Sequence, residues 1–262
     1  FPDAIKLVET NDDLAQLVNL VAHVMGEHLA KWNAGIELLV ALKANPKFAP
    51  GTTTEGAIQR SIEVMKIGGG QSASLDGFNT SDQIRIMAVA GSALAERDAM
   101  KARDLLTKSL NLARTGLDQK DPANRALAIT GNNLASVLEE KGNRSPAETE
   151  LMILASQTAR KYWEVAGTWL EVSRAEYRLA KTFLQAQDLD RAFRHAQICV
   201  ELCMENKAGE MDAFYSYEAL ALVEKARGNQ VGFAKASDYA KHYFGLLSPE
   251  DQKWCEESLK KL

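Results

Sequence analysis

A stripe of three cations offers the clearest candidate chemistry in this chain. Arg174 and Arg178 lie four residues apart, and Lys181 follows three residues later. Residues three and four apart share one face of a helix, so the three side chains project together. A guanidinium can hold a carboxylate through two parallel hydrogen bonds. Because the whole chain carries a formal net charge of −4, this local basic stripe favours binding of an acidic group.

A purely structural interpretation of the same stripe stays open. Arg174 and Arg178 can pair with Glu171, with Glu176 or with carboxylates of an adjacent helix. Such surface pairs contribute under about 1 kcal/mol to stability. The spacing alone therefore leaves both a ligand site and ordinary ion pairs as alternatives.

Other groups of reactive residues favour structure over chemistry. His23, Glu27 and His28 resemble a zinc motif only faintly, because residues five apart lie roughly 140° around an α-helix, whereas a zinc-binding pair needs a spacing of four. Cys199 and Cys203 lie on one helical face and are expected to be buried small residues.

Three further patterns also lack a catalytic or phosphate-binding arrangement. The run Gly68–Gly70 lacks the Gly-Lys-Ser/Thr ending of a phosphate loop and is expected to belong to a flexible loop. His195 and His242 have no nucleophile motif beside them. Adjacent carboxylates such as Glu139 and Glu140 splay apart on a helix and are expected to be solvated. The sequence thus predicts no catalytic residue, no metal site, no cofactor and no enzyme.

The cations belong to a stretch, residues 174–206, with two amphipathic patterns. A polar break at Gln187 and Asp188 divides it into two predicted helices. Ala180 on the first helix and Ala192 and Ala196 on the second let antiparallel helices approach closely. This stretch therefore predicts a helix–turn–helix unit.

The same order of residues recurs along the chain. Its other starts are Val21-Ala22, Val89-Ala90, Leu134-Ala135 and, less faithfully, Leu220-Ala221. From residue 89 onward they lie about 40–45 residues apart, against about 34 in a typical unit. The order resembles the tetratricopeptide repeat, a helix–turn–helix unit that stacks into a solenoid. The alternative is a helical bundle without repeats.

The resemblance implies an all-α fold, a right-handed α–α superhelix of about five helical hairpins. We expect one solenoid domain over residues 1–262, with a divergent first hairpin, an inserted helix and a Gly/Ser-rich loop in 11–80. Regular repeats follow in 81–246 and a capping helix in 249–261. The predicted helices there are 81–96, 98–116, 122–141, 146–164, 166–187, 189–206, 209–227, 230–246 and 249–261. An additional helix at 53–67 has no evident mate and is expected to pack across the stack.

In tetratricopeptide stacks the first helix of each unit lines the concave groove. Transferred to this sequence, the resemblance implies a peptide-binding groove formed by Asn132, Asn133, Ser136, Arg174, Tyr177, Arg178, Lys181 and Tyr215. The set is similar to the carboxylate clamp of chaperone-binding members, although Met87 and Gly91 stand where that clamp has Lys and Asn. Tyr177 and Tyr215 are either binding anchors or packing between helices.

Composition limits the classes of partner. The acidic balance disfavours a nucleic-acid surface, which needs a clustered basic face, and no apolar run is long enough for a membrane span. Three cysteines without framework spacing fit a reducing, cytoplasmic setting. The start at Phe1-Pro2-Asp3 leads us to expect a processed or trimmed piece of a longer protein.

We therefore predict a protein-interaction module that binds a peptide or protein segment, with acidic groups on the stripe. Reversing the charges of Arg174 and Arg178 together is expected to abolish binding and leave the melting temperature nearly unchanged. The alternative is a ligand- or peptide-sensing domain of a larger bacterial regulator, and a helical enzyme is a third class. Self-pairing into a homodimer is left open.

Overall fold

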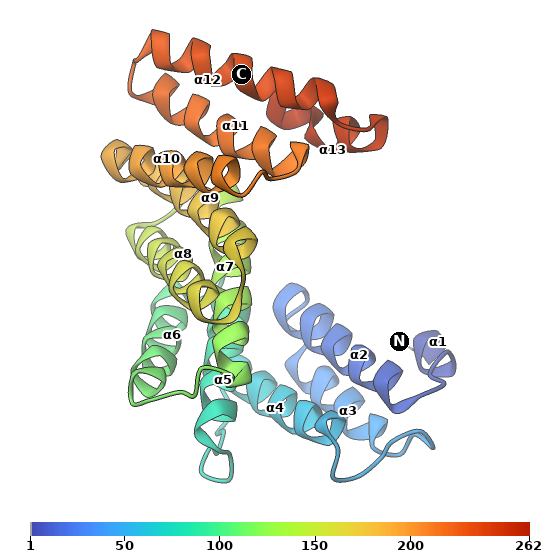
Figure 1. Cartoon of the computed structure of the whole chain (residues 1–262). Coiled ribbons are helices and arrows are strands. Elements are labelled where there is room, and N and C mark those ends of the chain that lie inside the picture. Colours follow the sequence, from blue (N-terminus) through green and yellow to red (C-terminus); the bar gives the residue numbers. More distant parts are fainter. Residues whose placement is uncertain (1) are drawn as a thin grey trace. The chain divides into compact units, whose positions relative to one another are not determined.

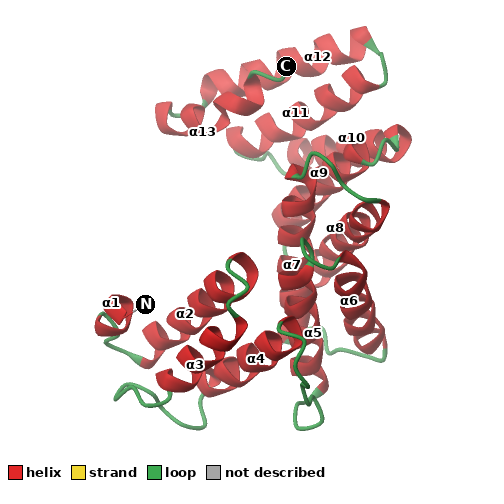
Figure 2. Cartoon of the chain, turned by 180° about the vertical axis from the view of Figure 1, so that it is seen from behind, coloured by secondary structure: helices red, strands yellow, loops and turns green. Residues whose placement is uncertain are grey.

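The computed structural model describes residues 2–262, without the side chains of residues 2 and 3, and is built from helices joined by loops (Figure 2). These residues contain no β-strand. The all-α prediction is therefore confirmed. The chain divides into two compact units, one up to Ala123 and one from Asn124 to Leu262. None of the described helices has the length and apolar character needed to cross a membrane.

The first unit begins with short helices and continues with longer ones. They are α1 (Pro2–Lys6), α2 (Asn11–Val21), the π-helix η1 (Ala22–His28), α3 (Trp32–Leu42), α4 (Thr53–Gly68), α5 (Thr80–Leu94) and α6 (Ala99–Arg114). A buried apolar cluster joins α2, η1, α3 and α4, and a second cluster joins α4 to α5. Neighbouring helices of the sequence thus pack against each other.

The second unit consists of helices that pack against their neighbours in the sequence. Its helices are α7 (Pro122–Glu140, which starts just before the unit), α8 (Pro146–Ala166), α9 (Trp169–Gln185), α10 (Leu189–Glu205), α11 (Glu210–Ala226), α12 (Gln230–Leu246) and α13 (Pro249–Leu259). The helices α8 to α12 follow one another in sequence order, each packed on the next or the one before (Figure 1). The end of the chain, α13, packs against α11 and α12.

Local cap chemistry places the helix starts where the sequence predicts them. Ser145 Oγ accepts a hydrogen bond from the Glu148 N–H at 3.3 Å, and the Glu148 carboxylate accepts one from the Ser145 N–H at 2.8 Å. Proline is well suited to the position after the cap, because the N–H of the first helical residue has no hydrogen-bond partner within the helix. Ser248 caps α13 through its side chain, whose Oγ accepts from the Asp251 N–H at 3.2 Å and donates to the Asp251 carboxylate at 2.7 Å. From residue 81 onward every predicted helix is confirmed, with ends shifted by a few residues.

Small residues allow the close helix crossings of the second unit. Ala180, Ala192 and Ala196 are fully buried in one cluster with Leu179 and Phe183. The cluster joins α9 to α10, as the 174–206 pattern predicts, and it also includes Ala219 and Val223 of α11. In the first candidate unit, which starts at Val21-Ala22, the repeat order predicts a small buried residue at Ala41. That prediction is wrong, because Ala41 is exposed while Leu39 and Leu42 are buried.

Gly131 lies where α7 and α8 cross closely. A Cβ atom at this position would lie 2.6 Å from the carbonyl oxygen of Ala155 and 2.9 Å from the backbone nitrogen of Ala159. Backbone atoms cannot move aside as a flexible side chain can, so the two helices must separate to admit a methyl group.

Gly131→Ala is therefore expected to lower the free energy of unfolding by about 1–3 kcal/mol, the range for overpacked sites. Urea denaturation followed by tryptophan fluorescence measures the change. Gly142→Ala is the matched control, because nothing lies within 4 Å of the added Cβ there. Equal stability of Gly131→Ala and the unchanged protein would contradict the close crossing.

Two expectations for the first unit need correction. The 53–67 helix does have mates, because α4 packs against α2, α3 and α5. The glycine run is also not simply a flexible loop. Gly68 ends α4, and a Cβ there would lie 2.5 Å from the Trp32 ring. Both differences arise because α3 and α4 pack side by side.

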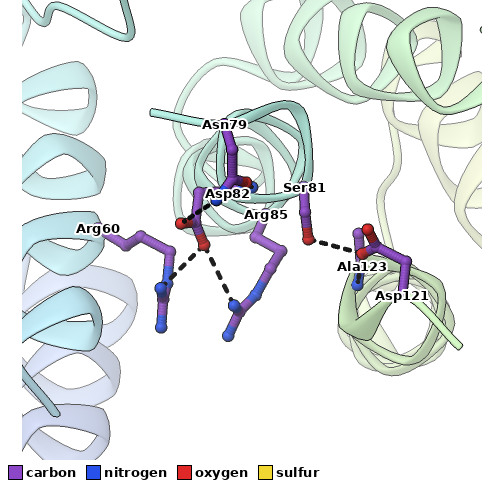
Figure 3. A network of polar contacts seen from close by, with 7 residues as sticks. All are labelled: Arg60, Asn79, Ser81, Asp82, Arg85, Asp121 and Ala123. Carbon is purple, nitrogen blue, oxygen red and sulfur yellow. Dashed lines mark hydrogen bonds and ion pairs between the residues drawn. The ribbon is translucent and has the colours of Figure 1, made fainter. Parts of the chain in front are cut away.

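A polar network fixes the start of α5 (Figure 3). Asn79 Oδ1 accepts from the Asp82 N–H at 2.8 Å and caps the helix. Asp82 Oδ1 in turn accepts from Arg60 of α4 at 2.8 Å and from Arg85 at 3.2 Å. Burial and the neighbouring Arg60 lower the pKa of Arg85. The shared carboxylate thus ties α4 to α5.

The segment after α2 departs from the α-helical geometry assumed for the sequence. The Leu29 N–H donates to the Val24 carbonyl at 3.0 Å, a bond that spans five residues. Residues 22–28 are accordingly π-helical, and one turn holds more residues than in an α-helix. The argument that His23 and His28 point apart is therefore wrong.

Candidate functional site

A hollow of about 700 Å³ lies in the second unit, between α7, α9, α11 and α13. We call it the hollow. Its lining residues are Asn132, Ser136, Glu139, Glu140, Ser173, Arg174, Tyr177, Arg178, Lys181, Gln185, Cys199, Met211, Asp212, Tyr215, Ser216, Ser258 and Lys261. The list includes each predicted groove residue except Asn133.

Helical spacing explains how α9 brings its side chains into the hollow. Arg174, Arg178 and Lys181 succeed one another at steps of four and three, with Tyr177 beside them. Such positions share one helix face. The start of α9 is fixed by Thr168, whose N–H and hydroxyl both donate to the Glu171 carboxylate, at 2.8 and 2.6 Å.

Each cation of the stripe has a carboxylate partner on an adjacent helix. Arg174 donates to both carboxylate oxygens of Asp212 on α11, from Nε at 2.7 Å and Nη2 at 3.1 Å. The Arg174 side chain is 59% exposed, compared with 19% for Arg178 and 16% for Lys181. Arg174 is thus the member of the stripe that faces solvent.

The Arg178 pair is buried. Glu139 of α7 accepts from Arg178 Nη1 at 2.5 Å and from the Thr182 hydroxyl at 2.7 Å. Its side chain is 8% exposed, so the expectation that it is solvated is wrong. Burial raises the pKa of Glu139, against the opposing effect of Arg178. We therefore expect charge reversal at Arg178 to destabilise the fold, which leaves Arg174 as the position for a binding test.

The Lys181 pair is buried as well. Glu218 of α11 is fully buried and accepts from Lys181 Nζ at 3.2 Å, while its other carboxylate oxygen has no hydrogen-bond partner. The Lys181 ammonium also lies 5.6 Å from the centre of the Tyr177 ring. This pair links α9 to α11, and Lys181 also lines the hollow.

The two tyrosines of the predicted groove contact each other. The rings of Tyr177 and Tyr215 meet edge to face with their centres 5.7 Å apart. Burial raises the pKa of Tyr177 well above its ordinary value. Burial and a contact with Cys255 raise the pKa of Tyr215 to about 12. Both phenols therefore stay protonated at neutral pH, and they serve helix packing while still lining the hollow.

The polar residues predicted on α7 separate into two groups. Asn132 and Ser136 line the hollow, whereas Asn133 is exposed and outside it. Adjacent helix positions project about 100° apart, so Asn132 and Asn133 cannot share one face. The side-chain amide of Asn132 does reach Asn133 Oδ1, at 3.4 Å.

Helical spacing could have identified several lining residues that the sequence prediction missed. Glu139 and Glu140 continue the Asn132–Ser136 face by three and four residues, and Gln185 continues the Lys181 face. Asp212 precedes Tyr215 by three residues on α11. Lys261 carries no such signal, because only the packing of the chain end beside α11 brings it there.

One buried thiol, Cys199, lines the hollow, and Cys203 follows it four residues later on α10. Cys199 and Cys203 are buried and free, as predicted. The Ser173 hydroxyl contacts their sulfur atoms at 3.6 and 3.2 Å. The contact with Cys199, supported by Ser173, lowers the pKa of Cys203 to about 7. Their burial keeps both thiols away from solvent.

The lining has both signs of charge and no arrangement typical of a metal centre. Within residues 2–262, no group of three or more His, Cys, Asp or Glu side chains is placed to hold a metal ion. The hollow offers hydrogen-bond donors and acceptors beside apolar rings, which suits binding of a polar segment or small molecule. Comparison with protein-family models, curated proteins and solved structures finds no match to this chain.

Proposed function

We propose that the chain is a tetratricopeptide-like solenoid, a right-handed superhelix that binds a segment of another protein in the hollow. The observation that carries the proposal is the hollow itself, whose lining includes Asn132, Ser136, Arg174, Tyr177, Arg178, Lys181 and Tyr215. These residues come from α7, α9 and α11, the first helices of three successive proposed hairpins, and the first helix lines the groove in such repeats. The layering of α8 to α12 in sequence order also supports this architecture.

Arg174 is the contact for an acidic group of the bound segment. Asp212 occupies its Nε and Nη2 edge, and Nη1 remains to donate to a ligand carboxylate. A second cation, Lys261, lines the same hollow. Because Arg178 and Lys181 are held in buried pairs, they contribute to the shape of the hollow more than to its charge.

Charge reversal at Arg174 tests the proposal. Twelve-residue peptides selected from a random phage library on the full chain serve as probes, with affinities measured by fluorescence anisotropy. A hydrogen bond to a charged group contributes about 1.5–3 kcal/mol. Arg174→Glu is therefore expected to lower the affinity for acidic peptides by roughly 10- to 100-fold.

The matched control for this test is Arg194→Glu, an exposed arginine of α10 outside the hollow. It is expected to bind the same peptides as the unchanged protein does. If Arg174→Glu retains full affinity, or if both variants lose it equally, the assignment of the hollow as the binding site is wrong.

A small-molecule sensor is the second candidate, favoured by the size of the hollow. Its volume of about 700 Å³ lies within the roughly 300–1,000 Å³ of small-ligand pockets. A metabolite that raises the melting temperature, with the shift lost in Arg174→Glu, would favour this candidate over a peptide partner.

A further inference from the structure

Two histidines outside the hollow are brought together by the π-helix. His23 and His28 lie five residues apart on η1. In an α-helix this spacing separates two side chains by roughly 140°. The wider turn of the π-helix, closed by the Leu29–Val24 bond, aligns them, and π-turns of this kind are frequent at functional sites.

The two rings present the same atom to each other. Nε2 of His23 lies 2.9 Å from Nε2 of His28, and the ring planes meet at 84°. Imidazole nitrogens are common ligands of transition metals. Both side chains are exposed, so an ion can reach the pair directly from solvent.

A carboxylate fixes the orientation of the first ring. His23 Nδ1 lies 2.8 Å from Glu27 Oε2. A carboxylate accepts a hydrogen bond, so Nδ1 carries the proton, and Nε2 of the neutral ring directs its lone pair at His28. Metal-binding histidines typically donate their other N–H to a carboxylate in this way.

The backbone beneath the pair is anchored to another part of the first unit. Arg97 donates to the carbonyl oxygens of Glu27 at 2.9 Å and His28 at 3.1 Å. Its guanidinium also lies 5.9 Å from the centre of the Trp32 ring. A ligand pair on fixed backbone loses little conformational freedom when it binds an ion.

We propose that His23 and His28 bind a divalent late transition-metal ion such as Zn²⁺ through their Nε2 atoms, with Glu27 orienting His23. Zinc–nitrogen bonds of about 2.0–2.1 Å place two tetrahedral ligands roughly 3.4 Å apart, so the exposed rings need only a small opening. Without the ion, His28 Nε2 carries the proton that it donates to His23 Nε2. When the ion binds, this proton moves to Nδ1 of His28, so the ring loses no proton. Water fills the remaining positions of the ion.

Zinc titration of the metal-free full chain, with a competing chromogenic chelator, tests the site. One Zn²⁺ is expected to bind per chain. His23→Ala and His28→Ala are each expected to weaken binding by at least about tenfold, because even outer partners of metal ligands contribute 10- to 100-fold. Glu27→Gln is expected to produce a smaller loss, since the amide oxygen still accepts from Nδ1–H.

The matched control is His242→Ala, which removes an exposed histidine of α12 and should leave zinc affinity unchanged. All variants retain Cys199, Cys203 and Cys255, so thiol binding cannot produce the expected difference. Circular dichroism checks that the exposed substitutions leave the helices intact. The proposal is overturned if His23→Ala and His28→Ala bind zinc as the unchanged protein does, or if His242→Ala weakens binding equally.

Discussion

Arg178→Met is expected to lower the free energy of unfolding by about 3–5 kcal/mol at neutral pH, the usual result of removing one partner of a buried ion pair. The substitution keeps the length of the side chain but removes the cation beside Glu139, whose side chain is 8% exposed and keeps its hydrogen bond from the Thr182 hydroxyl. Urea denaturation followed by tryptophan fluorescence measures the loss. Trp163, Trp169 and Trp254 all lie in the second unit.

The loss should depend on pH in a defined direction. Burial raises the pKa of Glu139 above its ordinary 4.5, and Arg178 opposes that rise. A carboxyl group whose pKa is raised by folding adds to the free energy of unfolding when the pH is below its unfolded-state pKa. This contribution is lost as the pH rises through the folded-state pKa. Removing Arg178 raises the pKa of Glu139 further. The variant should therefore lose less free energy of unfolding, relative to the unchanged protein, near pH 4.5 than at pH 7.

Replacing both Arg178 and Glu139 tests whether the unpaired carboxylate causes the loss of stability. In Arg178→Met with Glu139→Gln, no buried charge is left alone, and the new amide can still accept from Thr182. We expect this double variant to recover most of the stability lost in Arg178→Met. A double variant as unstable as the single one would mean that the uncompensated carboxylate is not the cause.

Lys181→Met is the second change with a large expected effect, again about 3–5 kcal/mol from an unpaired buried charge. Glu218 has no exposed side-chain surface and one carboxylate oxygen already without a partner. Methionine fills the space of the lysine stem but cannot donate a hydrogen bond. The free energy of unfolding in urea, measured as for Arg178→Met, gives the size of the loss.

Two further variants identify the origin of that loss. Lys181→Met with Glu218→Gln removes both charges and is expected to be clearly more stable than Lys181→Met alone. Lys260→Met removes a lysine that forms only exposed pairs with Glu256 and Glu257, and stability should not change measurably. Equal losses in Lys181→Met and Lys260→Met would contradict the importance of burial.

The sequence by itself determined the helices of the second unit and the face of α9 that lines the hollow. Helix starts depend on local chemistry, such as the hydroxyl and carboxylate of Ser145 and Glu148, and these residues are neighbours in the chain. The alignment of Arg174, Arg178 and Lys181 depends only on helical spacing. Such features need no knowledge of distant residues, which is why they could be predicted.

Only the tertiary structure decided what each cation faces and how η1 is wound. Glu139 and Arg178 are 39 residues apart, and no local pattern indicates that burial brings them together. Likewise His23 and His28 look misaligned at α-helical spacing, and packing of η1 within the cluster of α2, α3 and α4 accompanies the wider turn. Pairing and burial depend on which helices become neighbours in space, a property that spacing along one helix does not encode.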